Sequence, residues 1–274
     1  MSPNEALTLH DVAEELGVHY MTAYRYVRLG LLPAQREGRT WRIARSDLDA
    51  FGAHETPRTP RGQADWTERF TNRLLASDET GAWNVIEAAL ASGTTVPGGY
   101  TEIIVPALNR IGSMWEEGTI DVATEHAASE ITRRVMGRLG PRMTTRGVRR
   151  GMVVVGSTAT ELHSLPLAIL SDLLRAAHFD VANLGAYLPP DAFAAFLGAA
   201  DGVVAVCIGV TMQGQDEELA ATINAVRSAT EAPIFVGGPG VDEAIAGRLG
   251  ANGWARTADE GVHLVEEAVA ASKR

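Results

Sequence analysis

The spacing of hydrophobic and polar residues changes twice along the chain, which indicates three structural blocks. Residues 65–143 keep a helical period, whereas residues 149–274 alternate short apolar runs with amphipathic stretches. A helical period indicates one-sided helices, and short apolar runs are typical of strands buried on both faces. Residues 52–64 hold two prolines and almost no large apolar side chain, as linkers do. We therefore predict a small domain at 1–51, a linker at 52–64, a helical domain at 65–148 and an α/β domain at 149–274.

The first block has the element order of a winged helix-turn-helix. Thr8 is a candidate N-cap for a helix over residues 9–16, whose apolar side chains share one face. A second helix is predicted over residues 20–29, after a glycine that allows a sharp turn. Residues 33–43 then predict a short hairpin. This order is typical of DNA-binding domains in which the second helix enters the major groove.

The other two blocks predict a four-helix bundle and a doubly wound, flavodoxin-like parallel sheet. Four amphipathic stretches with short connections between residues 65 and 143 indicate the bundle. In the last block, strands alternate with helices, and such sheets bind ligands at the carboxyl ends of their strands. The predicted strands are Met152–Val155, Val181–Leu184, Val203–Ile208, Ile234–Val236 and a weaker one near Trp254.

Composition narrows the class of protein. A hydrophobic content of 46% and a charged content of 21% are those of a globular protein. No apolar run approaches the roughly 20 residues that a membrane-spanning helix needs, and the N-terminus does not have the pattern of a secretory signal. The single cysteine, Cys207, lies in an apolar run and is expected to be buried. We expect a cytoplasmic protein without a membrane partner.

Charge is distributed unevenly along the chain. The net charge is −10, yet residues 19–45 carry six arginines against one glutamate, a local charge of +5. A basic segment within an acidic chain favours binding to double-stranded operator DNA. The first block resembles the excisionase and MerR-like DNA-binding family in its helix, turn and hairpin. The side chains expected to meet DNA are Tyr20, Thr22, Arg25, Tyr26, Arg39 and Arg42.

Two groups of residues carry candidate chemistry. His163 follows the first predicted strand of the α/β block, where it can ligate a metal, act as a base or cap the next helix. Glu161, two residues earlier, can hold one ring nitrogen and leave the other free, as around metal-binding histidines. In the bundle, Trp115 precedes Glu125 and His126 by ten and eleven residues. These three are either a core tryptophan with a solvent-exposed pair or a cover over a flat ligand.

Together these motifs resemble the cobalamin-binding photoreceptor repressors of the CarH/LitR type. The resemblance implies that His163 binds cobalt from below and that the bundle covers adenosylcobalamin, or another cobalamin, from above. It also implies that glycines after two strands line the path of the nucleotide tail. The residues expected to contact the cofactor are Trp115, Glu125, His126, Glu161, Leu162, Ser164, Leu165, Gly209, Val210, Thr211, Gly237, Gly238 and Gly240.

Two positions depart from that pattern. Pro166 stands where the family has a glycine close to the tail, and it adds bulk and removes an N–H group. Glu116 stands where the family has a histidine that takes the upper cobalt position after illumination. A carboxylate is a poor replacement for an imidazole on cobalt, so either His126 or water is expected to take that position.

The function implied is a cobalamin-dependent, light-responsive transcriptional regulator, a repressor that is not an enzyme. Light would cleave the cobalt–carbon bond and change the assembly of a homo-oligomer, a dimer or a tetramer, on operator DNA. One alternative is a sensor of another corrinoid form, or of a second tetrapyrrole such as a bilin, in the same pocket. A second alternative is a corrinoid methyl-transfer module, which has no use for a helix-turn-helix. Scattered histidines and a single cysteine disfavour a zinc enzyme.

Overall fold

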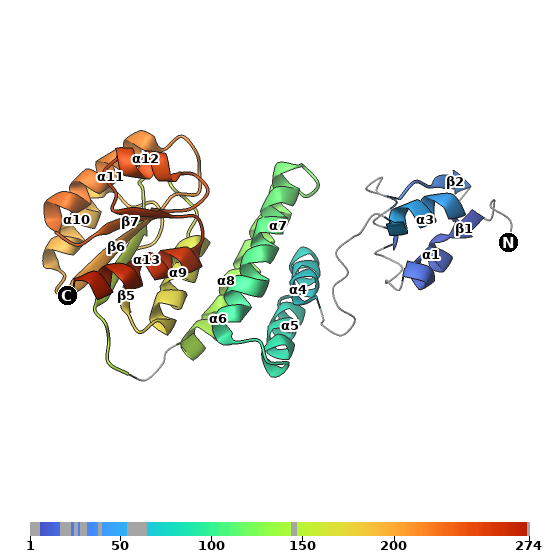
Figure 1. Ribbon diagram of the computed structural model, residues 1–274, viewed down its shortest axis with the longest axis horizontal. Helices are drawn as coiled ribbons and strands as arrows, with labels where there is room; N and C mark the ends of the chain where they lie inside the picture. Colours follow the sequence, from blue (N-terminus) through green and yellow to red (C-terminus); the bar gives the residue numbers. More distant parts are fainter. Residues whose placement is uncertain are drawn as a thin grey trace. The chain divides into compact units, whose positions relative to one another are not determined.

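The computed structural model describes residues 6–16, 23–24, 27, 32–37, 40–53, 65–143 and 147–272 (Figure 1). The chain divides into two compact units, residues 1–64 and residues 65–274. The division falls at the end of the predicted linker. The bundle and the α/β domain together form the second unit. In the described part of the chain, no helix is both long and apolar enough to cross a bilayer.

The first unit contains a small antiparallel sheet in the order β1-β3-β2. Its strands are β1 (Ala6–Thr8), β2 (Gln35–Glu37) and β3 (Thr40–Ala44), and its helices are α1 (Leu9–Leu16) and α3 (Arg45–Ala53). Thr8 caps α1 as predicted, because its Oγ1 accepts the N–H of Asp11 at 3.3 Å. The hairpin of β2 and β3 is confirmed by the pairing of Glu37 with Thr40. Strand β1 was not predicted. Of the predicted second helix, Ala23, Tyr24 and Val27 are described, and all three are helical.

The second unit begins with the predicted four-helix bundle. Its elements are α4 (Trp66–Leu75), α5 (Glu79–Ala91), α6 (Val96–Gly98), η1 (Gly99–Ile104), α7 (Val105–Glu116), α8 (Val122–Leu139) and η2 (Gly140–Met143). The third bundle helix is composite, because α6 and α7 are joined by the π-helical turn η1. Asp65, Asp78, Thr95 and Asp121 each accept a backbone N–H of the first helical turn that follows. These caps explain where the bundle helices begin.

The α/β domain is a parallel sheet in the order β5-β4-β6-β7-β8, which is the flavodoxin-like order. Its strands are β4 (Met152–Ser157), β5 (Asp180–Asn183), β6 (Val203–Gly209), β7 (Ile234–Gly237) and β8 (Gly253–Ala255). Its helices are α9 (Leu165–Ala176), α10 (Pro190–Ala199), α11 (Asp216–Ala229), α12 (Glu243–Arg248) and α13 (Ala258–Ala271). All five predicted strands are confirmed, including the weak one at Trp254.

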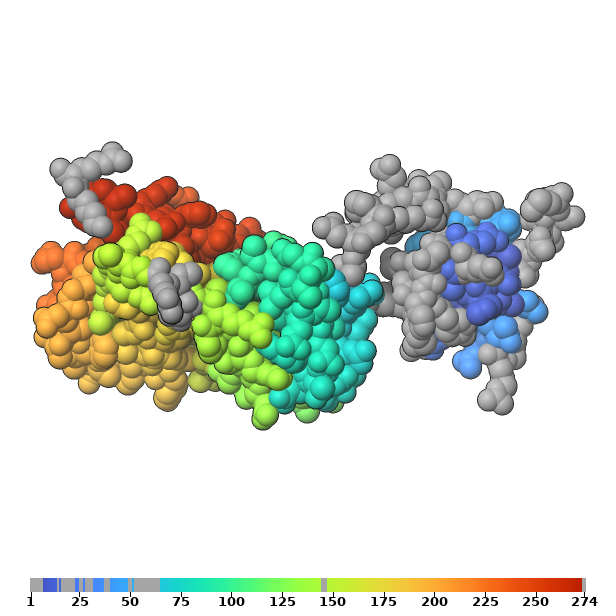
Figure 2. Space-filling view, turned by 90° about the horizontal axis from the view of Figure 1, so that it is seen from below, coloured from blue at the N-terminus to red at the C-terminus, as the bar shows by residue number. Residues whose placement is uncertain are grey.

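Alternation along the strands assigns the two faces of the sheet. Val153 and Val155 pack with α9, α13 and the bundle, whereas Val154 packs with α10 and α11. In Figure 1, α9 and α13 lie between the sheet and the bundle. Figure 2 shows the bundle, cyan to green, meeting the yellow-to-red α/β domain. Cys207 is buried, as predicted, and burial raises the pKa of its thiol to about 12.

Candidate functional site

His163 lies in the loop between β4 and α9, at the carboxyl edge of the sheet. The chain passes from β4 to β5 on one side and then to β6 on the other, so the loops after β4 and β6 diverge at this point. Open α/β sheets bind their ligands at such switch points. The His163 side chain is 50% exposed, which leaves it accessible to a ligand.

Glu161 is the most firmly held side chain of this site. Its side chain is 1% exposed and accepts four hydrogen bonds. Oε1 accepts from Nδ1 of His163 at 2.5 Å and from the His163 backbone N–H at 2.9 Å. Oε2 accepts the backbone N–H groups of Thr211 at 2.6 Å and Met212 at 3.0 Å. One carboxylate therefore ties the loop after β4 to the loop after β6.

The hydrogen bonds decide the charge of this pair. Burial by itself raises the pKa of Glu161, but the donors from His163, Met212 and Thr211 outweigh it and lower that pKa to about 2. The hydrogen bond to Glu161 in turn raises the pKa of His163, burial opposes this rise, and the charges of Glu161 and Glu125 add to it. Because Nδ1 donates to an ionised carboxylate, Nε2 is the ring nitrogen left to bind a metal.

The predicted cover residues lie at the adjoining ends of α7 and α8. Trp115 is 47% exposed, so it is not a core tryptophan of the bundle. Glu125 accepts from Ser129 Oγ at 2.7 Å and pairs with Nδ1 of His126 at 2.6 Å. The charge of Glu125 contributes to the pKa of His163. The Glu125 carboxylate of α8 therefore acts on His163 through its charge.

Exposed apolar side chains gather around this edge. Leu162, Tyr187 and Met212 follow β4, β5 and β6 respectively, and each is at least 45% exposed. Clusters of exposed apolar side chains are uncommon on the surface of a folded protein, and they often mark a ligand-binding site. Tyr187 and Met212 were not predicted from the sequence. Their signal was their position in loops that follow predicted strands.

The other residues predicted to contact the cofactor lie close together in the loops after β4, β6 and β7. Several of them make their contacts there through backbone atoms. Ser164 Oγ accepts from Arg133 of α8 at 3.0 Å, and Leu165 is buried at the start of α9. Val210 is buried, and its N–H donates to Gly237 O at 2.8 Å. Gly238 and Gly240 lie directly against the backbone of Val210 and Met212. The glycines after β7 therefore pack on the loop after β6, and their predicted contact with a nucleotide tail stays a prediction.

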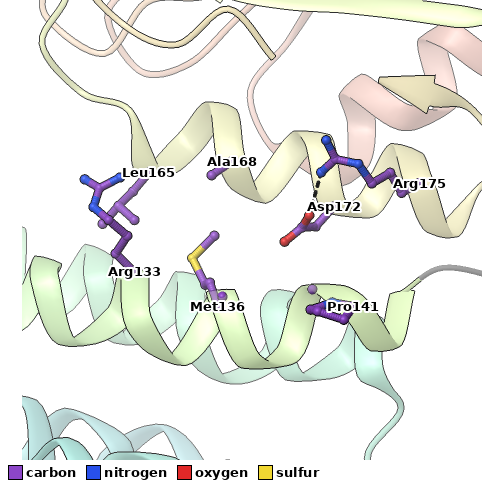
Figure 3. Close-up of a pocket in the computed structure, with 9 residues that line it drawn as sticks. Arg133, Met136, Pro141, Leu165, Ala168, Asp172 and Arg175 are labelled. Carbon is purple, nitrogen blue, oxygen red and sulfur yellow. Dashed lines mark hydrogen bonds and ion pairs between the residues drawn. The ribbon is translucent and has the colours of Figure 1, made fainter. Parts of the chain in front are cut away.

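A groove of about 410 Å³ lies between α8 and α9 (Figure 3). Arg133, Met136 and Pro141 face Leu165, Ala168 and Asp172 across it. At one end Arg133 reaches Ser164, and at the other the Tyr100 hydroxyl donates to Asp172 Oδ2 at 2.7 Å. Burial and the Asp172 carboxylate raise the pKa of Tyr100, so its hydroxyl stays protonated. The groove thus lies in the interface between the bundle and the α/β domain, and it was not predicted from the sequence.

The predicted DNA contacts lie mostly outside the described residues. Arg42 is on β3, where it pairs in register with Gln35 and Thr8. Its neighbourhood includes Arg36, whose guanidinium lies 5.9 Å from the ring centre of Trp41. The predicted contacts outside the described residues are Tyr20, Thr22, Arg25, Tyr26 and Arg39.

The donor set around His163 fits a metal that arrives inside a macrocycle. Among the described residues, no three His, Cys, Asp or Glu side chains are grouped to hold a bare ion. A single imidazole with one free nitrogen, beside exposed apolar side chains, instead fits an apolar ring that supplies the other metal ligands itself.

Comparison with known proteins agrees with this geometry. Residues 66–139 and residues 151–268 each match a family described as a B12 binding domain. Residues 6–52 match a helix-turn-helix domain. These matches support cobalamin binding by the second unit and a helix-turn-helix in the first.

Similar proteins are corrinoid proteins. A corrinoid protein of Desulfitobacterium hafniense is 24% identical over 170 residues, which are 60% of this chain and 79% of that protein. Trimethylamine corrinoid protein 2 of Methanosarcina acetivorans is 24% identical over 220 residues, 76% of this chain and 98% of that protein. The structure of the Methanosarcina barkeri monomethylamine corrinoid protein is similar with a TM-score of 0.65 and 17% identity, over 74% of this chain and 97% of that one. This likeness supports the fold of bundle plus parallel sheet.

Proposed function

We propose that this protein is a DNA-binding regulator that senses a cobalamin, and that it is not an enzyme. The observation that carries the proposal is the His163–Glu161 pair, which leaves one imidazole nitrogen available at a ligand-binding edge. The same chain carries a helix-turn-helix match at its N-terminus. A binding domain joined to a DNA-binding domain couples ligand state to DNA affinity without any chemistry on a substrate.

In this proposal, residues of the α/β domain would contact one face of the cofactor and residues of the bundle the other. His163 would hold cobalt through Nε2, and Glu161 keeps the imidazole in the orientation and tautomer that this would require. Trp115 offers an indole at the end of α7, and Glu125 offers a carboxylate for ribose hydroxyl groups. Contact with the apolar edge of the ring would bury the exposed side chains of Leu162 and Met212, which stabilises the complex.

The proposed signal is visible light. When bound, adenosylcobalamin supplies a cobalt–carbon bond that light cleaves. Glu116, exposed next to Trp115, is a carboxylate and a poor partner for cobalt, so His126 or water would be the group that binds the metal on the bundle side after illumination. His126 is 73% exposed, and Glu125 engages its Nδ1, so Nε2 is the ring nitrogen left for a ligand.

The proposed output is the assembly state on operator DNA. Several linked helix-turn-helix domains bind DNA more tightly than one, so a change from oligomer to monomer releases the operator without altering any base contact. We propose a homo-oligomer, dimer or tetramer, in the dark, acting as a repressor.

The test uses the full chain loaded with adenosylcobalamin in the dark. Its absorption spectrum, its mobility on a sizing column and its retardation of operator DNA are measured before and after green light. We expect all three to change in the wild type. A wild type whose spectrum and DNA binding ignore light would refute the light response. A protein that retains no cobalamin at all would refute the sensor.

A second candidate is a corrinoid methyl-transfer module. The observation in its favour is that the similar proteins named above are corrinoid proteins, matched over 60% and 76% of this chain. Full-length protein loaded with methylcobalamin separates the two functions. A transfer module would pass its methyl group to a thiol acceptor in the dark and bind DNA with no dependence on the cofactor. A dark, light-independent response to methylcobalamin or to a bilin would instead indicate a sensor of another ligand.

A further inference from the structure

The two faces of the proposed cofactor site are built on different domains. His163 and its loop belong to the α/β domain, whereas Trp115 and Glu125 belong to the bundle. A group bound between them is held well only if the two domains keep a fixed spacing at this edge, because a binding site gains affinity when its parts are already in place. A contact that fixes this spacing therefore contributes to binding without touching the ligand.

Helix α8 carries a row of polar side chains on one face. Glu125, Ser129 and Arg133 follow one another at intervals of four residues, so they share that face. Where the row begins, Ser129 Oγ donates to Glu125 at 2.7 Å. Two turns of helix after Glu125, about 12 Å along the axis, Arg133 Nη2 donates to Ser164 Oγ at 3.0 Å. Ser164 is the residue after His163, so the row ends on the loop that carries the proposed cobalt ligand.

The Ser164 hydroxyl is available to Arg133 because it does not cap its own helix. Ser164 is the N-cap residue of α9, where a serine usually accepts the N–H of the second or third helical residue. The second helical residue is Pro166, which has no N–H. Within the described loop and helix, the Ser164 side chain makes no capping hydrogen bond. Pro166 thus leaves this hydroxyl to the bundle.

The Arg133 guanidinium is also held from its own helix. Its Nε donates to Glu130 Oε1 at 3.3 Å, about one turn earlier on α8. In Figure 3, Arg133 lies at the end of the groove beside Leu165, the first residue of α9. Farther along, the groove is lined by residues whose side chains are too short to bridge it, namely Gly137, Gly140 and Ala168. At the end next to His163, the guanidinium therefore ties α8 to the α/β domain.

We infer that Arg133 is a positioning residue that holds the bundle at a fixed spacing from the His163 loop, and that this spacing favours a cobalamin with a large group on the bundle side. The inference rests on the proposed cobalamin binding and names the form that the site selects. A large group such as adenosyl has to fit against Trp115 and Glu125, so its binding depends on where α8 lies. A cobalamin with a methyl group there depends mainly on His163 and little on the bundle.

The first experiment compares adenosylcobalamin with methylcobalamin on the full chain by equilibrium dialysis in the dark. Both carry a cobalt–carbon bond, so they differ chiefly in the size of the group on the bundle side. Arg133→Ala should raise the dissociation constant of adenosylcobalamin about fivefold, the effect of one lost hydrogen bond, and that of methylcobalamin less than about twofold. Arg133→Lys keeps a donor at this position and should recover most of the affinity for adenosylcobalamin.

Arg134→Ala is the matched control, because Arg134 is the next residue on α8 and pairs with Glu79 inside the bundle at 2.8 Å. It should change neither dissociation constant by more than about twofold. Ser164→Ala should act like Arg133→Ala, and the double variant should bind adenosylcobalamin no more weakly than either single variant, because all three lack the same hydrogen bond. A second measurement needs no cofactor: amide hydrogen exchange over residues 161–168 should be about fivefold faster in Arg133→Ala and unchanged in Arg134→Ala.

Equal weakening of both cobalamins by Arg133→Ala would show a general structural role and overturn the inference. Additive effects of the Arg133 and Ser164 substitutions, or hydrogen exchange that ignores Arg133→Ala, would overturn it as well. A wild type that binds neither cobalamin would refute the proposed function itself. The two failures are therefore distinguishable.

Discussion

Replacing Glu161 with glutamine tests the centre of the site. Glutamine keeps the size of the side chain but removes the charge and turns one acceptor oxygen into an NH₂ donor. The buried carboxylate accepts hydrogen bonds from four N–H groups. In the variant, the NH₂ group of glutamine must therefore point at the N–H donors of one of the two loops. If the NH₂ group turns to His163, Nδ1 becomes the acceptor and the proton moves to Nε2, where it blocks metal binding.

The magnitude follows from the pKa of Glu161. The fall from the ordinary value of 4.5 to about 2 corresponds to about 3 kcal/mol of stability at neutral pH. This contribution is full above the unfolded pKa and is lost as the pH falls through the folded value of about 2. Glu161→Gln should therefore lower the free energy of unfolding by about 3 kcal/mol at pH 7, with a difference that shrinks below about pH 4.5.

Urea denaturation of the cofactor-free protein between pH 3 and pH 8 measures this. Glu267→Gln, at a position away from the ends of α13 in the same domain, is the matched control and should lower the free energy of unfolding by well under ~1 kcal/mol. The affinity of the Glu161 variant for cobalamin should fall by about 10- to 100-fold. A stability difference that stays constant down to pH 3, or unchanged cobalamin affinity, would refute the reasoning.

Three further substitutions test the other parts of the site. His163→Ala should weaken cobalamin retention by about tenfold or more and shift the bound spectrum toward the free form; an unchanged spectrum would remove His163 as the lower ligand. His126→Ala should leave dark binding intact but alter the spectrum after illumination if its imidazole takes the upper position, whereas an identical photoproduct would assign that position to water. Tyr100→Phe should cost about 1 to 2 kcal/mol in urea denaturation, because it removes the hydroxyl that donates to Asp172 across the joint. A cost near zero would show that this hydrogen bond does not help to hold bundle and sheet together.

Local pattern was sufficient to predict most of the described elements of both units. The apolar runs around Val154 and Val206 predict strands, and both lie in the core of the sheet. The helix caps at Thr8 and Asp121 involve residues three positions apart, so they can be recognised from the sequence. The position of His163 after a buried strand placed it at the ligand-binding edge. The strand β1 was missed because three residues show no period, and its pairing with β3 depends on chain some 36 residues away.

The sequence by itself therefore determined most of the elements, their order and the Glu-x-His motif, since these depend on neighbours within a few residues. The tertiary structure decided what those residues contact. The bonds from Glu161 to the N–H groups of Thr211 and Met212 join positions 50 and 51 residues apart, and Tyr100 meets Asp172 across 72 residues. Leu167 fills the space above Gly209 because α9 packs on the sheet at that point. Such contacts are set by how distant elements pack, and no local period or spacing encodes that packing.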